Sequence, residues 1–338
     1  MRVTINIGLL LILLLLASAP LAEGQEFSVM FYNVENLFDT SDDTTTNDDE
    51  FLPAGSRHWT TGRYRKKLNA LAQAISAAGQ WELPALAGLC EVENEAVVRD
   101  LAYGTILSAG NYGIAHRESP DRRGIDLALL YNRDRCRVID VRSCIPQRTD
   151  DDPFESRNLL YVKTVTAGDT LHVILCHFPS RRGGVLATEG AREEMARLVR
   201  VTTDSIIASS DGASVIVMGD FNAGADDGIM KIITDGAHLI NAAAFFPAGR
   251  GGSYRYQGTW ELIDQILVSS SMTDGTGSFH ADLQSFRLPD APFLLTDDQA
   301  YPGKKPFSTY SGYRWVGGYS DHLPVLITIG HSSTSLRR

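Results

Sequence analysis

The segment 215–222, with the sequence VIVMGDFN, places a carboxylate and an amide directly after a run of apolar residues. Residues 215–218 have the β-branched character of a short buried strand, and Gly219 can turn the chain. Because alternate side chains of an extended chain point the same way, Asp220 and Asn222 can face one cleft. The Asp could deprotonate a water while the amide donates a hydrogen bond to it or to a phosphoryl oxygen. The alternative is an ordinary loop after a core strand, since these are common turn residues.

Polar side chains follow or interrupt several other apolar runs in the same way. Carboxylates, amides and imidazoles occur at or beside the ends of expected strands, at Asn33, Glu91, His177, Asp220, Asn222, Asp264, Asp321 and His322. In folds that alternate strands and helices, the ends of central strands are the expected place for a site. A set of oxygen and imidazole groups without cysteine suits a hard cation such as Mg²⁺. The sequence therefore predicts a metal-assisted site at these strand ends.

The apolar patterns predict a chain that alternates strands with helices and contains several hairpins. The expected strands cover residues 27–32, 83–89, 112–116, 125–131, 138–141, 159–165, 171–176, 215–218, 262–268 and 325–329. An amphipathic helix is expected over 64–78, where apolar residues recur with helical spacing and Arg and Lys are assigned to the opposite face. Further helices are expected near 95–101 and over 191–209.

Three loops could border the site. The loop after His177 contains Pro, Ser, two Arg and two Gly, a composition suited to binding an anion. Its candidate substrate ligands are Ser180, Arg181 and Arg182. Residues 39–62 are rich in Asp and Thr but lack the spacing of a helix-loop-helix calcium site, which favours a solvated loop or a loop at a cleft edge. Residues 289–318 are rich in aromatic side chains, and we expect them to form a cleft wall.

Asp126 and the cysteines lie in strand-like segments, where a side chain needs burial or a partner. Because an Asp inside a strand requires a partner, Asp126 is a further candidate for substrate binding. Cys90 and Cys176 lie in apolar runs and are expected to be buried thiols. Cys136 and Cys144 could form a disulfide across a hairpin, and the sequence leaves this open.

The first 24 residues have the features of a secretory signal peptide, with a basic residue, an apolar run and then small residues. We expect cleavage before Gln25. The apolar run is too short to span a membrane, and no later stretch is as long and as apolar. The sequence therefore predicts an exported, soluble protein, periplasmic or extracellular, with one catalytic domain over 25–331 and a tail over 332–338.

The net charge of −10 bears on the partners of the chain. An acidic protein is disfavoured as a tight, non-specific binder of nucleic acid, because such binding is driven by neutralising phosphates with basic side chains. Divalent cations at the site can offset local repulsion, so a nucleic-acid substrate is not excluded.

The motifs, taken together and in order, resemble the endonuclease/exonuclease/phosphatase family, also called the deoxyribonuclease I-like superfamily. The resemblance covers nearly the whole mature chain. Its motifs are YNVEN at 32–36, CE at 90–91, HFPS at 177–180, GDFN at 219–222, IDQI at 263–266 and SDH at 320–322. This resemblance implies a four-layer α/β sandwich, in which two mostly antiparallel sheets pack face to face and helices lie outside.

The resemblance also implies roles for individual residues. It implies that Glu91 is the principal metal ligand and that Asn33, Glu35 and Asp321 lie near the metal. It implies that Asp220, held by Asn222, orients or deprotonates the attacking water. His322, paired with Asp264, would bind phosphoryl oxygens, and His177 would face the phosphate or the leaving group. The implied metal is Mg²⁺, with Mn²⁺ or Ca²⁺ as alternatives.

The expected function is a phosphoesterase that acts on phosphodiesters as a monomer. A nuclease is the first option, and an enzyme acting on lipid, inositol or sugar phosphates is the alternative. A binding protein that kept the scaffold and lost the chemistry would be expected to have lost one or more of Glu91, Asp220, Asp264 and His322, and all four are present.

Overall fold

The computed structural model describes residues 26–80, 82–146, 157–181, 184, 188–236, 238–247, 249–289 and 291–331. The expected signal peptide and the tail over 332–338 therefore lie outside the described residues, as does Arg182. None of the described helices is long and apolar enough to cross a membrane.

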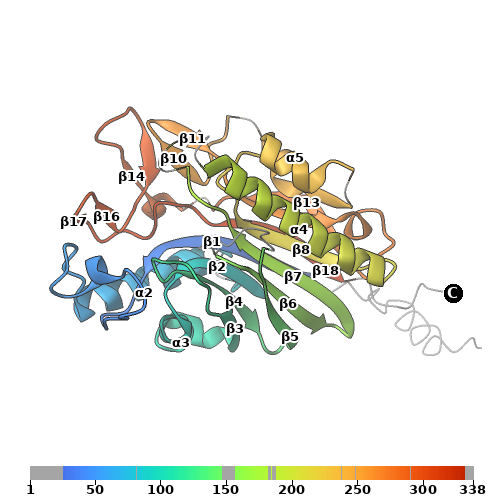
Figure 1. Cartoon of the computed structure of the whole chain (residues 1–338), viewed down its shortest axis with the longest axis horizontal. Coiled ribbons are helices and arrows are strands. Elements are labelled where there is room, and N and C mark those ends of the chain that lie inside the picture. The colour runs from blue at the N-terminus through green and yellow to red at the C-terminus, as the bar shows by residue number, and fades with distance from the viewer. Residues whose placement is uncertain are drawn as a thin grey trace, which may run out of the picture.

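Two six-stranded sheets form the centre of the molecule (Figure 1). The first contains, in spatial order, β13 (Phe279–Arg287), β18 (Val325–His331), β1 (Phe27–Leu37), β2 (Leu86–Val92), β4 (Asp126–Asn132) and β3 (Tyr112–Arg117). The second contains β5 (Cys136–Cys144), β6 (Leu159–Thr166), β7 (Asp169–His177), β8 (Ser214–Asp220), β12 (Asp264–Ser269) and β9 (Leu239–Asn241). Within each sheet one pair is parallel, β1 with β2 and β7 with β8, and the others are antiparallel.

Helices cover the outer face of each sheet, as Figure 1 shows. The helices α2 (Thr61–Ala78) and α3 (Glu95–Tyr103) pack on the first sheet, and α4 (Glu189–Ser209) and α5 (Gly228–Thr234) pack on the second. The helix α2 begins at the N-cap Thr60, whose side chain accepts a hydrogen bond from the backbone N–H of Arg63, and ends before Gly79. The expected four-layer α/β sandwich is confirmed.

Three apolar clusters separate these layers. One joins the first sheet to α2 and α3, through side chains such as Leu71 and Leu89. A second lies between the two sheets, where Phe31 belongs to one and Val173 to the other. The third joins the second sheet to α4 and α5. Burial of apolar area in these layers, at about 25 cal/mol per Å², is the main favourable contribution to folding and fixes the two sheets face to face.

Cys136 and Cys144, whose pairing the sequence leaves open, do not form a disulfide. Both residues lie on the single strand β5, at its two ends, and both are free thiols. A strand rises about 3.3 Å per residue, so their Cα atoms are far beyond the 7 Å that a disulfide can bridge.

Residues 291–318, which were expected to form a cleft wall, contain two short hairpins. The strand β14 (Leu295–Asp297) pairs with β15 (Lys304–Pro306), and β16 (Tyr310–Ser311) pairs with β17 (Arg314–Trp315). Several of the aromatic rings pack inward: Tyr310 and Trp315 contact the fully buried Trp59, with ring centroids 6.1 and 5.6 Å away. A third hairpin pairs β10 (Tyr254–Tyr256) with β11 (Thr259–Glu261).

Candidate active site

Three of the expected site residues lie side by side where three neighbouring strands of the second sheet begin or end. His177 ends β7 and is the parallel partner of Asp220, which ends β8. Asp220 is in turn the antiparallel partner of Asp264, which begins β12. All three side chains are buried. Because β12 runs opposite to β7 and β8, the start of one strand meets the ends of the other two.

The first sheet contributes further side chains beside these strand ends. Asn33 in β1 donates a hydrogen bond from Nδ2 to Asp220 Oδ2 at 3.1 Å, which joins the two sheets. Ser320, in the segment before β18, donates from Oγ to the backbone oxygen of Asn33 at 2.7 Å. The same hydroxyl accepts from the backbone N–H of His322 at 3.1 Å. These bonds fix the segment that carries Asp321 and His322 against β1.

A β-bulge places the side chain of Glu91 beside these residues. The pairing of β2 with β4 skips from Cys90 to Val92, so Glu91 is the extra residue of the bulge. Its φ of 62° is in the left-handed region, which is costly for a residue other than glycine. The side chain accepts a hydrogen bond from the backbone N–H of Asn36 at 3.0 Å, and its other oxygen lies 3.8 Å from His177 Nε2.

The imidazole of His322 is held between two carboxylates. Its Nδ1 lies 2.7 Å from Asp264 Oδ2 and its Nε2 lies 3.8 Å from Asp220 Oδ2. Burial alone would lower the pKa of His322, but the charge and hydrogen bond of Asp264, with the charge of Asp220, raise this pKa well above its usual value. His322 is therefore an imidazolium that can donate to a phosphoryl oxygen.

Asp220 combines a raised pKa with a fixed orientation. Burial and the charge of Asp264 raise the pKa of Asp220 to about 7, against the opposing effects of His322, the backbone N–H of Asn222 and the side chain of Asn33. The backbone N–H of Asn222 donates to Asp220 Oδ1 at 2.9 Å, and the Asn222 amide donates to the backbone oxygen of Phe178 at 3.1 Å. A buried carboxylate with a pKa near neutrality is suited to accept a proton from water.

Lys67 forms a buried ion pair with Glu35, and the charges of Asp321 and Glu91 also act on it. Lys67 is fully buried, its Nζ lies 3.7 Å from Glu35 Oε2, and it donates to the backbone oxygen of Tyr319 at 2.6 Å. Burial and the charge of Glu35, with that of Glu91, raise the pKa of Asp321 to about 7. Glu35, Glu91 and Asp321 offer only carboxylate oxygens as ligand atoms. This donor set fits a hard divalent cation.

His177 is kept neutral by its surroundings. Its pKa is well below the usual value because of burial and the adjacent charge of Arg157, whose Nη1 lies 3.0 Å from His177 Nδ1. Arg157 is itself buried, and its Nε lies 3.5 Å from Asp121 Oδ2. His177 Nε2 also lies 3.6 Å from Asp220 Oδ2. Through its contact with His177, Arg157 places a buried positive charge beside the catalytic carboxylates, where an anionic substrate would bind.

The remaining sequence candidates have other contacts. Asp126 binds within its own hairpin: its Oδ2 lies 3.0 Å from His116 Nε2, and its Oδ1 accepts from the backbone N–H of Ser119. This is the partner that a buried Asp requires, and it gives no support to a role in substrate binding. Ser180 and Arg181 follow β7 as expected, and the guanidinium of Arg181 is engaged by the carboxylate of Glu261.

Two site residues, Lys67 and Arg157, are absent from the sequence-based candidates. Lys67 was assigned to the polar face of its helix, which is wrong. Its spacing from Tyr64 and Leu71, at i+3 and i−4, places it on the apolar face, and this signal could have identified it. Arg157 lies just before β6, in a polar stretch with no pattern that distinguishes it.

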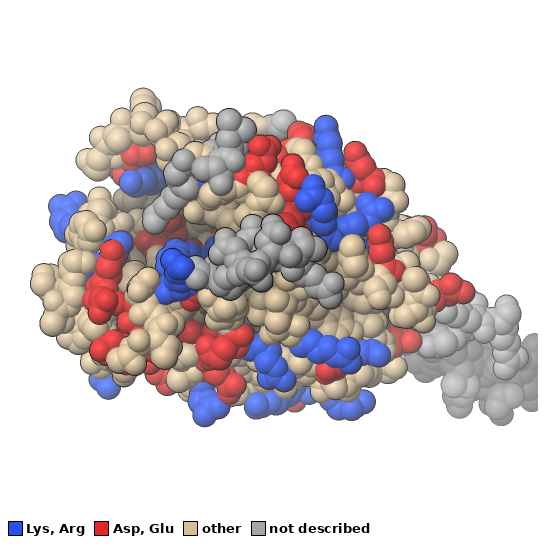
Figure 2. Space-filling model, viewed as in Figure 1, with Lys and Arg blue, Asp and Glu red and all other residues tan. Residues whose placement is uncertain are grey.

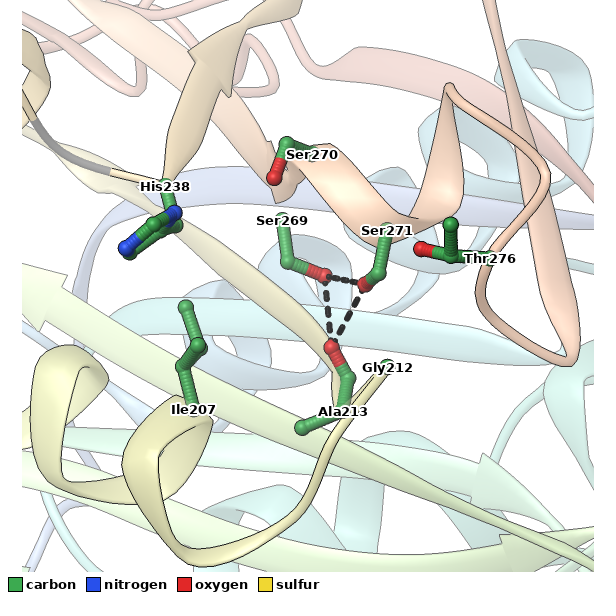
Figure 3. A pocket seen from close by; sticks show the side chains of 8 residues that line it. All are labelled: Ile207, Gly212, Ala213, His238, Ser269, Ser270, Ser271 and Thr276. Atoms are coloured by element: carbon green, nitrogen blue, oxygen red, sulfur yellow. Dashed lines mark hydrogen bonds between the residues drawn. The ribbon is translucent and has the colours of Figure 1, made fainter.

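A pocket of about 170 Å³ lies at the opposite ends of β8 and β12 (Figure 3). It is lined by Ile207, Gly212, Ala213, His238, Ser269, Ser270, Ser271 and Thr276. Ser269 and Ser271 both donate to the backbone oxygen of Ala213, at 2.9 and 2.7 Å, so their hydroxyls are used within the protein. The catalytic side chains therefore lie outside this pocket.

Comparisons with known proteins identify the family. A family model described as Endonuclease/Exonuclease/phosphatase family matches residues 28–331. The chain belongs to this family. Its members are hydrolases of phosphate esters that use divalent metals, in agreement with the oxygen-rich site. None of the curated proteins compared with the sequence matched it.

Solved structures of the endonuclease/exonuclease/phosphatase family share the fold. A family protein from Bacteroides thetaiotaomicron has a TM-score of 0.60 and 16% identity, over 92% of this chain and 99% of that one. The mannosyl-6-phosphatase Bt3783 of B. thetaiotaomicron has a TM-score of 0.59 and 16% identity, over 90% and 99%. A humanized D. rerio TDP2 has a TM-score of 0.57 and 16% identity, over 90% and 99%.

Proposed function

We propose that this protein is an exported, Mg²⁺-dependent phosphoesterase that hydrolyses its substrate by in-line attack of water. The observation that carries the proposal is the arrangement of Asp220, Asp264 and His322 at adjoining strand ends. A carboxylate able to accept a proton stands 3.8 Å from an imidazolium able to donate one. The carboxylate of Glu91 lies 3.8 Å from His177 Nε2, and Asp321 directly precedes His322 in the chain.

Asp220 would act as the proton acceptor and His322 as the hydrogen-bond donor. Asp220 accepts a proton from the attacking water, and its hydrogen bonds from Asn33 and Asn222 hold the carboxylate in place. His322 donates to a non-bridging phosphoryl oxygen, where negative charge increases in the transition state, and Asp264 keeps it protonated.

The metal side of the site would be held by the chain's own oxygens. Glu91, with Glu35 and Asp321, would hold the cation. Asn33 would lie near it and accepts from the backbone N–H of Glu35 at 3.0 Å. When bound, Mg²⁺ supplies positive charge that neutralises the phosphoryl oxygens. Neutral His177 and the buried cation Arg157 would contact the phosphate from the other side, where they add charge stabilisation without competing for the proton.

A compact phosphate ester, such as a sugar or lipid phosphate, is the substrate class that the charges favour. On the face drawn in Figure 2, many Lys and Arg side chains gather along the lower margin, and acidic side chains lie over the rest of the face among uncharged residues. The net charge is −10, and acidic side chains crowd the loop after β1. A long polyanion would meet repulsion on this surface.

A nucleic acid is the second candidate, and Tyr254 is the observation that favours it. Its ring lies 4.8 Å from the imidazole of His322, centroid to centroid, and is partly exposed. An aromatic ring beside the reacting phosphate could stack on a base. The rings at 289–318, which could have served this purpose, pack in part against the core.

Hydrolysis of a substrate panel tests the proposal. The panel contains mannose 6-phosphate, inositol phosphate, sphingomyelin, plasmid DNA and RNA, each with Mg²⁺ and with EDTA. Metal-dependent phosphate release from the sugar phosphates, without nicking of the plasmid, is the expected result. Nicking of the plasmid at a comparable rate would favour the second candidate. Absence of turnover on every substrate by a folded, metal-binding protein would overturn the proposed activity.

Export is tested at the N-terminus. We propose removal of residues 1–24 during secretion, so mass spectrometry of the protein from culture medium or periplasm should find Gln25 as the first residue. Retention of Met1 on the active protein in the cytoplasm would contradict it.

A further inference from the structure

The loop between β1 and α2 carries a second concentration of carboxylates, separate from the catalytic ones. It runs over residues 39–60 and lies beside α2 at one end of the molecule (Figure 1). Asp42, Asp48 and Asp49 each place a carboxylate oxygen within 4.8 Å of the others. Two oxygens bound on opposite sides of one Ca²⁺, each at about 2.4 Å, have a separation of this size.

Acidic side chains at a surface often gather without a ligand, but Asp48 is not at the surface. It is 2% exposed, and its Oδ1 has no hydrogen-bond partner among the described residues. Its Oδ2 accepts from the backbone N–H of Asp43 at 3.0 Å. Leaving a buried carboxylate oxygen unpartnered costs about 1–3 kcal/mol or more, so this oxygen requires a cationic or donor partner.

Within the described residues, few salt bridges join basic side chains to the acids of this loop. Among the described residues, Glu50 is the only acid of segment 39–50 with a salt bridge, to Arg57 at 2.9 Å. The carboxyl group of Glu93 lies beside this loop and accepts from the backbone N–H of Asp39 at 2.6 Å. Burial, together with the charges of Asp39 and Asp48, raises the pKa of Glu93 to about 8. The loop therefore has an excess of negative charge that a divalent cation would balance.

We propose that Asp42, Asp48 and Asp49 form a binding site for Ca²⁺, separate from the catalytic metal site. Ca²⁺ fits better than Mg²⁺, because it accepts flexible, carboxylate-rich coordination at longer distances. The segment is tied to the rest of the domain: the backbone N–H of Asn47 donates to the oxygen of Arg122 at 2.8 Å, and Phe51 stacks on Phe38 at 4.4 Å. Bound Ca²⁺ would hold these contacts together.

Calorimetric titration of the EDTA-treated, dialysed mature chain with CaCl₂ tests the proposal. The expected dissociation constant is about 0.1–1 mM, the range of extracellular calcium modules. Asp42→Asn with Asp49→Asn, both at exposed positions, should weaken this binding more than tenfold, and Asp48→Asn should do the same. The exposed Asp211→Asn is the matched control and should bind as the unaltered chain does. Unchanged affinity in the double variant would overturn the proposal.

A second measurement separates this site from the catalytic one. Saturating CaCl₂ should raise Tm by about 3 °C or more, and this rise should persist in Glu91→Gln but disappear in the double variant. If the rise disappeared in Glu91→Gln and persisted in the double variant, the Ca²⁺ would be bound at the catalytic site and the proposal would be wrong. Because both readouts are binding and stability, failure of the proposed phosphoesterase activity would leave this test unaffected.

Discussion

His322 and Asp264 form a buried pair in which imidazole Nδ1 lies 2.7 Å from carboxylate Oδ2. His322 precedes β18 of one sheet, and Asp264 begins β12 of the other, so the pair spans the interface of the sandwich. The pairing keeps His322 protonated and directs its Nε2 toward Asp220. The relative position of the two sheets therefore sets the geometry of the proton chemistry.

Removing the charge of Asp264 should disable this pair. We expect Asp264→Asn to lower kcat by about 10²–10⁴-fold, because His322 would lose the charge that holds its proton. His322→Gln should lower kcat by a similar factor, and the double variant should be little worse than either single one, since the two residues act as a unit. Steady-state kinetics, with circular dichroism to confirm folding, measures this. Losses that simply multiply in the double variant would contradict the pairing.

Lys67 should be needed for stability, because it is a buried charge beside Glu35. Lys67→Met leaves the Glu35 carboxylate without its cation and should lower the free energy of unfolding by about 3 kcal/mol. The exposed neighbour provides the matched control, and Lys66→Met should change stability by less than about 0.5 kcal/mol. Urea unfolding of both variants measures the difference. Equal stabilities would show that Lys67 does not balance Glu35.

The stability of the metal-free protein should fall as pH rises. The pKa values of Asp220 and Asp321 are raised to about 7 and that of Glu93 to about 8, chiefly by burial. Above the unfolded-state pKa of about 4, the folded protein keeps protons that the unfolded chain has released. The stability linked to these protons is complete below about pH 4 and is lost as pH rises through 7 to 8.

Urea unfolding in EDTA from about pH 5 to about pH 8.5 measures this dependence. We expect the free energy of unfolding to decrease over that range, with a shallower decrease in Glu93→Gln. Added Mg²⁺ should restore more stability at the alkaline end, where the carboxylates are ionised. A free energy of unfolding that rises with pH in EDTA would contradict the raised pKa values.

The sequence predicts the strand ends well because the signal for a strand end lies in adjacent residues. The apolar runs before Asp220 and before His177 are recognisable as buried strands, and the polar residue that ends each run needs no knowledge of distant contacts. The motifs then identify the family and its sandwich. By contrast, β13 is absent from the expected strands, although Phe279, Ala281 and Leu283 alternate with polar side chains in the pattern of a half-buried strand.

The contacts between distant segments are what the sequence could not provide. Arg157 contacts His177, 20 residues later in the chain, and no local pattern marks it. The inward packing of Tyr310 depends on Trp59, which is some 250 residues earlier in the chain. An aromatic residue in an irregular segment has the same local sequence whether it lines a cleft or fills a core, so only the folded chain distinguishes the two.

The most direct test of the account is the rate of bis-p-nitrophenyl phosphate and p-nitrophenyl phosphate hydrolysis by the unaltered chain and by Asp220→Asn. With Mg²⁺ the unaltered chain should hydrolyse at least one of these esters. EDTA should abolish that activity, and added Mg²⁺ should restore it. Asp220→Asn should remain folded and lose at least about 10³-fold in kcat, because the water would lack its base. Full activity in folded Asp220→Asn, or activity that survives EDTA, would contradict the account.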